Sequence, residues 1–154
     1  MKKNFVNIVL LFVLVFLTNC GYSPLLVSNK IDFNIADMSF EGERKINNYI
    51  ENSLNNQIRP KKSMKSFDLK IKSSFEKTIT NKDKSGDPKN YNLKLITSII
   101  AISNNSETAS KTFEKNISLS AQNKKIDEIE LEKKYIKDLS ELIGKDIIFF
   151  LINQ

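Results

Sequence analysis

A chain of 154 residues with a net charge of +6 has room for one domain with a modest hydrophobic core. The absence of histidine and the single cysteine exclude the usual zinc and copper sites, and also Ser-His and Cys-His catalytic pairs. The four glycines are widely separated, so no glycine-rich loop can cradle a phosphate. We therefore expect a non-enzyme without cofactor or metal, and a hydrolase based on two carboxylates is the catalytic class left open.

The positive charge gives little information about a partner. The excess is lysine, spread along the chain, with arginine at two positions only. Such a dispersed charge is compatible with an anionic partner such as lipid phosphate, and equally with a solvated lysine-rich surface. We expect no nucleic-acid partner.

The beginning of the chain has the pattern of a bacterial lipoprotein signal. Two lysines precede an apolar run at residues 5–17, which is shorter than the ~20 residues that span a bilayer. The run leads into Leu-Thr-Asn-Cys, in which Cys20 is placed for cleavage and acylation, although Asn19 replaces the usual Gly, Ala or Ser. We expect a signal peptide at residues 1–19 and a lipidated tether at 20–30. The alternative is an anchor in the inner membrane that is never cleaved.

Four segments have the alternating apolar pattern of strands with one buried face. The first begins at Ile31, and a slip in its alternation near Ala36 predicts a bulge. The others run from Phe67 to Thr80, from Tyr91 to Ile102 and from Thr112 to Ala121, and the turn-forming linkers predict an antiparallel meander of long hairpins.

The strands also predict which side chains are buried. The inward face is expected to carry Phe67, Leu69, Ile71, Phe75, Ile79, Leu93, Leu95, Ile99, Phe113, Ile117 and Leu119. The third predicted strand has isoleucines on the opposite parity too, which predicts burial on both faces toward its far end, at Ile96, Ile100 and Ile102.

Two segments have the periodicity of helices. Residues 41–58 carry an apolar stripe and are followed by Pro60, which stops the helix; the stripe is Ile46, Tyr49, Ile50, Leu54 and Ile58. The second helix begins near Asp127, which with Glu130 resembles a capping box. Its expected buried stripe is Ile129, Ile136, Leu139, Ile143, Ile147 and Leu151, widened by Leu142, Phe149 and Phe150.

The order of these elements predicts an α+β fold for residues 31–154. We expect a two-layer sandwich in which a four-stranded, mainly antiparallel sheet has two helices packed on one face, in the order β-α-β-β-β-α.

These features together resemble one family, the lipopolysaccharide (LPS) assembly lipoprotein LptE. The start Cys20-Gly21-Tyr22-Ser23-Pro24-Leu25 looks like the mature N-terminus of that family, and the order of elements matches. The run from Asp127 to Leu139 is similar to the closing helix of its alphaproteobacterial members. The resemblance spans essentially the whole mature chain.

The resemblance implies a structural role at the cell outer membrane. LptE-type proteins sit in the lumen of the LPS-translocating barrel LptD, which they plug and help to assemble, and they bind LPS. Gly21 follows the cysteine with no aspartate near it, which by resemblance to enterobacterial lipoproteins implies sorting to the outer membrane. The alternative function is a periplasm-facing outer-membrane lipoprotein that acts as a binding or scaffold module unrelated to LPS.

One cluster of lysines is the candidate contact surface. Lys82, Lys84, Lys89 and Lys94 gather around the tip and strands of the second predicted hairpin. As point charges they are expected to meet lipid A phosphates or acidic residues of the barrel. The alternative is that they are solvated loop lysines.

Overall fold

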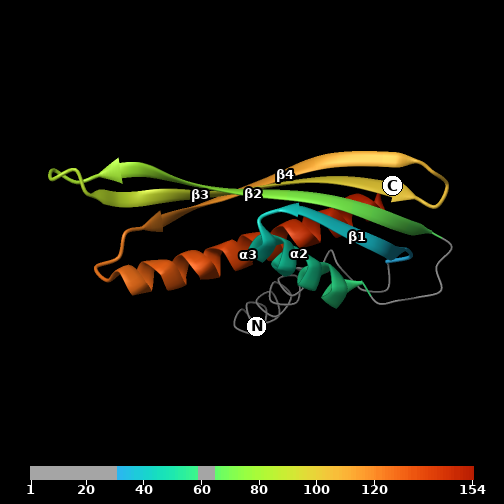
Figure 1. Cartoon of the computed structure of the whole chain (residues 1–154), viewed down its shortest axis with the longest axis horizontal. Helices are drawn as coiled ribbons and strands as arrows, with labels where there is room; N and C mark the ends of the chain where they lie inside the picture. The colour runs from blue at the N-terminus through green and yellow to red at the C-terminus, as the bar shows by residue number, and fades with distance from the viewer. Residues whose placement is uncertain (1–30, 59–64) are drawn as a thin grey trace, which may run out of the picture. The chain divides into compact units, whose positions relative to one another are not determined.

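A four-stranded sheet with both helices on one of its faces makes up the described part of the chain (Figure 1). This computed structural model describes residues 31–58 and 65–154. The elements are β1 (Asn34–Gly42), α2 (Arg44–Gln57), β2 (Ser66–Lys82), β3 (Pro88–Ser103), β4 (Thr108–Ser120) and α3 (Lys125–Ile152). The predicted signal peptide, Cys20 and the tether lie outside the described residues.

The sheet has the strand order β1-β2-β3-β4. β2 pairs antiparallel with β3 and β3 antiparallel with β4, which confirms the predicted meander of long hairpins. β1 pairs parallel with β2, since α2 crosses over between them. The predicted α+β two-layer fold is therefore confirmed, with one parallel pair at an edge of the sheet.

The first strand contains the predicted bulge. Its register against β2 shifts between Ile35 and Asp37, where the alternation of the sequence slips. The strand begins at Asn34, later than expected, but Ile31 and Phe33 are still buried. The ring of Phe33 packs edge-on against Phe67 with the centroids 5.6 Å apart, so the segment that leads into β1 closes one end of the core.

The core lies between the sheet and the helices. Alternate residues of β2, β3 and β4 face the helices, and most of the predicted inward side chains are buried. Ile79 is an error of the prediction, because it is 49% exposed. Ile79 lies two residues closer to the hairpin tip than Lys77, which contacts Glu128 in the first turn of α3.

The predicted two-sided burial of β3 is wrong. Ile100 is 42% exposed, and Ile96 and Ile102 are half-buried. β3 is an interior strand, so β2 and β4 pair with its two edges. Pairing at the edges does not cover the second face of the strand, which is buried only when another layer packs on it. Both helices lie on the other side of the sheet (Figure 1).

The helix α2 buries the predicted stripe, with Tyr49 only half-buried. Asn47, which does not belong to the predicted stripe, is also buried. Its amide nitrogen donates to the Glu41 carbonyl at 3.1 Å, and its amide oxygen accepts from the Ser73 hydroxyl at 2.5 Å. These bonds fix the start of α2 against β1 and β2.

The helix α3 departs from its prediction at both ends. It begins at Lys125 after an N-cap at Lys124 that makes no side-chain capping bond, so the predicted capping box at Asp127 and Glu130 is wrong. Within the predicted stripe Ile129, Leu142 and Phe149 are exposed, whereas Ile148 is fully buried. α3 packs against α2 as well as the sheet, so the sheet alone does not set its buried face. No helix in the described ranges is long and apolar enough to cross a membrane.

Candidate functional site

The tip of the β2–β3 hairpin is a tightly bonded turn. The Asp83 carboxylate accepts hydrogen bonds from the amides of Ser85 and Asp87, at 2.8 and 2.9 Å. The Gly86 amide donates to the Asp83 carbonyl at 3.1 Å, and Gly86 has a φ of +90°, which glycine adopts without strain. An Asp at the start and a Gly near the end of a hairpin loop favour this geometry. The turn is therefore well defined.

This turn brings together three of the four predicted contact lysines. Lys82, Lys84 and Lys89 are all exposed at the tip, and Lys82 lies opposite Pro88 in the strand register. They surround a turn that also carries Asp83 and Asp87. The structure thus places a mixed but lysine-rich group at the end of a projecting hairpin (Figure 1).

Lys94 is separated from these three lysines. In the strand register Lys94 lies opposite Glu76. Glu76 is six residues from Lys82 along β2, a separation of about 20 Å. The Lys94 ammonium is 3.0 Å from the Glu114 carboxylate on β4, and its side chain is only 31% exposed. Lys94 therefore belongs to a cross-strand ion pair on the sheet.

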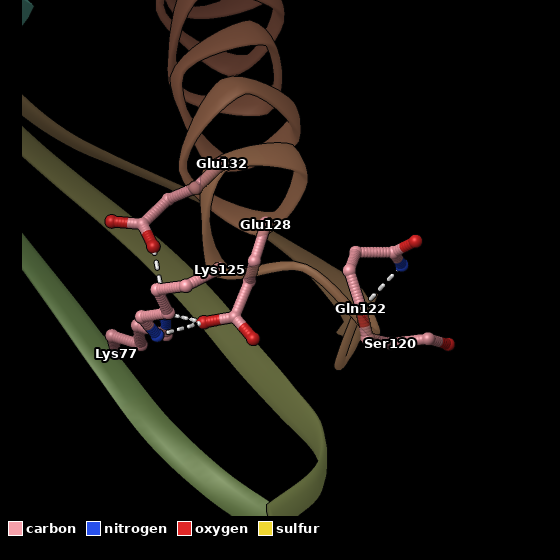
Figure 2. A network of polar contacts seen from close by, with 6 residues as sticks. All are labelled: Lys77, Ser120, Gln122, Lys125, Glu128 and Glu132. Carbon is pink, nitrogen blue, oxygen red and sulfur yellow. Dashed lines mark hydrogen bonds and ion pairs between the residues drawn. The ribbon is translucent and has the colours of Figure 1, made fainter.

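A second group of charged side chains ties the hairpin to α3 (Figure 2). The Lys77 ammonium, from β2, contacts Glu132 at 2.7 Å and Glu128 at 3.1 Å, and Lys125 contacts Glu128 at 2.6 Å. Lys77 also lies 4.1 Å from the centroid of the Tyr91 ring on β3. We call Lys77, Tyr91, Lys125, Glu128 and Glu132 the hairpin clamp, because it joins both strands of the hairpin to the start of the helix.

The hairpin clamp shifts the pKa values of Lys77 and Glu128. Burial acts to lower the pKa of Lys77, but the hydrogen bonds to Glu132 and Glu128 outweigh it and raise that pKa above the ordinary value of lysine. The hydrogen bond from Lys125 is the main cause that holds the pKa of Glu128 below the ordinary value of glutamate, against the opposing effect of burial. Both groups therefore stay charged across the neutral range.

The hairpin clamp is not among the features predicted from the sequence, although the sequence carries one signal of it. Lys77 occupies the inward parity of its strand, between Phe75 and Ile79. A lysine on an apolar parity needs a carboxylate partner when it is enclosed. The sequence offers many carboxylates, and only the packing of α3 against the hairpin shows that Glu128 and Glu132 are the partners.

The face of the sheet opposite the helices contains a depression of about 220 Å³. Its lining residues are Ser39, Glu41, Lys70, Ile71, Lys72, Ser98 and Ile100. The depression is therefore lined by polar and charged side chains of β1, β2 and β3 together with two isoleucines.

Comparison with known proteins shows a likeness in fold alone. No protein-family model matches the chain, and no curated protein matches it in sequence. The structure is similar to rare lipoprotein B from Shewanella oneidensis, with a TM-score of 0.59 and 10% identity over 76% of this chain and 94% of that one. It is similar to lipoprotein B from Nitrosomonas europaea, with a TM-score of 0.55 and 13% identity over 75% of this chain and 79% of that one. It is also similar to a minor lipoprotein from Acinetobacter baumannii, with a TM-score of 0.51 and 12% identity over 75% of this chain and 90% of that one. The chain thus has a fold found in bacterial lipoproteins.

Proposed function

We propose that this chain is a lipid-anchored outer-membrane protein that plugs the LPS-translocating barrel LptD, helps it to assemble, and binds LPS during its insertion into the outer leaflet. The observation that carries the proposal is the fold, which the chain shares with several bacterial lipoproteins over about three quarters of its length. The lipoprotein-like start at Cys20 and the resemblance to the LptE family point the same way. The role is structural and uses no catalytic residue.

Features of the described residues suit a plug. The lumen of a transmembrane barrel is polar, so a plug needs a polar exterior. The outward positions of β2 and β4 are polar and exposed, and several charged side chains are already paired, as in Lys94–Glu114 and Lys115–Asp146. The hairpin clamp joins both strands of the hairpin to α3 close to the lysines of the tip.

A pull-down tests the barrel partner. The tagged full-length protein is extracted from outer membranes in a mild detergent, and co-purifying proteins are identified by mass spectrometry. We expect a large β-barrel protein near one-to-one. A well-solubilised, lipidated sample that yields no barrel would overturn the plug function and leave a scaffold or binding lipoprotein unrelated to LPS.

A second experiment tests LPS binding at the hairpin tip. Lys82, Lys84 and Lys89 are changed together to Gln, and binding of purified LPS is measured by retention on the immobilised full-length protein. We expect weaker binding that is also more easily lost in salt, because the lysines would contact phosphate as point charges. A matched control changes three exposed lysines elsewhere, Lys124, Lys133 and Lys134. Equal binding by both triple variants would exclude the tip as the LPS contact.

A further inference from the structure

The exposed surface of α3 changes in character along the helix. From residue 130 to residue 141 all of the exposed side chains are charged: Glu130, Lys133, Lys134, Lys137 and Asp138. From residue 142 to residue 152 the exposed side chains are three large apolar residues and one lysine: Leu142, Lys145, Phe149 and Ile152. The three apolar side chains are 45%, 53% and 37% exposed, in that order. The outer surface of α3 is therefore charged in its middle and apolar at its C-terminal end.

The four exposed side chains of this C-terminal end form one stripe. They follow one another at spacings of three, four and three residues, which places them on one side of the helix. Ile143 and Ile147, which are fully buried, face the core instead. At 1.5 Å per residue the stripe is about 15 Å long. We call Leu142, Lys145, Phe149 and Ile152 the terminal stripe.

The charges beside the terminal stripe favour contact with lipid. Asp146 is the one acidic residue from 142 to 152, and its carboxylate lies 2.6 Å from the Lys115 ammonium of β4. Lys145 therefore lies among apolar side chains in a segment whose one carboxylate is already paired. A lysine in such a place packs its apolar stem against its neighbours while its ammonium reaches the phosphates of lipid head groups. A stripe of aliphatic, aromatic and lysine side chains is typical of helices that lie at a membrane surface.

The geometry of α3 restricts such a contact to the surface of a membrane. The terminal stripe is about half as long as the hydrocarbon core of a bilayer is thick, which is about 30 Å. The other side of this part of α3 packs on the sheet and on α2, through residues such as Gly144 and Ile147. The outer side of the helix end is thus the side that meets lipid, and it rests on the bilayer.

The chain enters the described unit at the same end. Figure 1 shows the start of β1 and the C-terminal end of α3 at one end of the sheet. Phe33 packs against Phe67, and Phe67 and Gln154 line one depression of about 220 Å³. The predicted tether, residues 20–30, leads from Cys20 to this end and reaches at most about 40 Å when fully extended. An acylated Cys20 therefore holds the end that carries the terminal stripe close to the membrane.

We propose that the terminal stripe contacts the bilayer that carries the acyl chains of Cys20. Phe149 and Ile152 lie in the interfacial region, and Lys145 lies at the head-group phosphates. The proposal rests on the lipid anchor of the proposed function, but not on the barrel or on LPS. The acyl chains supply the attachment, and because they keep the local concentration of lipid high, a weak contact by the stripe is enough to orient the protein. The C-terminal end of α3 then faces the membrane, and the charged middle of the helix faces water.

Spin labels measure this contact. The lipidated protein is reconstituted at low density into vesicles of phosphatidylethanolamine and phosphatidylglycerol, with a nitroxide on Leu142→Cys or Phe149→Cys, or on Lys133→Cys or Lys134→Cys as controls. Acylation of Cys20 leaves the introduced cysteine as the reactive thiol. We expect the ratio of collisions with oxygen, which concentrates in lipid, to collisions with a water-soluble nickel complex to be several-fold higher at the stripe than at the controls.

Each other outcome of this experiment contradicts a different step. Equal ratios at all four positions, in a protein that stays with the vesicles, would overturn the membrane contact and leave the proposed function intact. A protein that does not stay with the vesicles would overturn the lipid anchor, on which both proposals rest. Dipolar broadening between labels at position 149, removed by dilution with unlabelled protein, would assign the stripe to a second copy of the chain and overturn the lipid contact.

A charge substitution tests the stripe within one labelled protein. In the Leu142→Cys background, Phe149→Asp places a carboxylate in the terminal stripe, and Lys134→Asp makes a matched change in the charged middle of α3. We expect Phe149→Asp to lower the ratio at the label several-fold, to that of the lysine positions, and Lys134→Asp to leave it unchanged. An equal ratio in both variants would overturn the role of Phe149. Circular dichroism checks folding; should Phe149→Asp fail to fold, Ile152→Asp replaces it, and an unchanged ratio overturns the contact.

Discussion

Glu128 is the most enclosed charged side chain in the described part of the chain, with 3% of its surface exposed. Its carboxylate accepts hydrogen bonds from Lys77 on β2 and Lys125 on its own helix. A buried carboxylate without partners would cost several kcal/mol, so these two ammonium groups are what allow it to stay charged. Glu128 therefore joins the hairpin to the start of α3 through its bond with Lys77.

We predict that Glu128→Gln lowers the free energy of unfolding by about 1–3 kcal/mol, because Lys77 and Lys125 lose a charged partner inside a partly enclosed site. The measurement is urea denaturation followed by circular dichroism. Glu130→Gln is the matched control, since Glu130 lies in the same turn of helix but is exposed. Equal midpoints for the two variants would contradict a stabilising role for Glu128.

The hairpin clamp also predicts a dependence of stability on pH. The pKa of Glu128 is lowered in the folded protein, so its contribution is fully present above the ordinary value near 4.5 and is lost as the pH falls through the folded pKa. The pKa of Lys77 is raised, so its contribution is fully present below the ordinary value near 10.5 and is lost as the pH rises above it. Unfolding midpoints measured from pH 7 to pH 3 should fall less steeply in Glu128→Gln than in the unchanged protein. Parallel profiles would contradict this assignment.

At the scale of elements, the crossing of α2 and α3 depends on one glycine. A Cβ atom added at Gly144 would lie 2.7 Å from the Ser53 Cβ and would also meet the Ser53 hydroxyl. The two backbones can approach this closely because neither helix has a large side chain at the crossing. Ser53 completes the contact by donating to the Glu141 carbonyl at 3.4 Å.

Gly144→Ala is expected to lower the free energy of unfolding by about 1–2 kcal/mol. Overpacking at the crossing costs about 1–3 kcal/mol, and the better helix propensity of alanine offsets part of that cost. Thermal and urea denaturation measure the loss. In the Gly144→Ala background, Ser53→Gly should recover part of the stability because it removes the side chain that the new methyl group meets; an additive double variant would argue against a direct contact.

The β2–β3 hairpin is longer than the helical layer that covers its inward face. Its strands are the longest in the sheet, and their distal part runs past the first turn of α3 (Figure 1). Ile79, two residues closer to the tip than Lys77, is exposed although it keeps the inward parity. An alternating pattern reports which side of a strand faces inward, but it does not report how far the covering layer extends.

At the scale of the whole molecule, the anchor at Cys20 is a prediction from the sequence. Cys20→Ala should abolish labelling by radioactive palmitate, because the variant has no cysteine to carry the acyl chains. It should also move the protein from the membrane fraction to the soluble one, because those chains provide the stable anchoring. The far-ultraviolet circular dichroism spectrum should not change, since Cys20 lies outside the unit formed by residues 31–154. Labelling that persists in the variant would contradict acylation at this site.

The gathering of charged side chains on the surface also belongs to this scale, because strand register and helix packing decide it and no motif along the chain shows it. The hairpin lysines show the same dependence: three of them meet at one turn, whereas Lys94 is held in a separate ion pair by the strand register.

The sequence by itself determined the number, type and order of the elements, the α+β class and most of the core. It did so because strand and helix periodicities are local, and because a bulge or a stopping proline acts on its immediate neighbours. Tertiary structure alone decided the exposure of Ile100, the burial of Asn47 and Ile148, and the partners of Lys77. Each of these depends on which surface another element covers. That is a long-range choice, set by how the helices cross one another and lie on one face of the sheet.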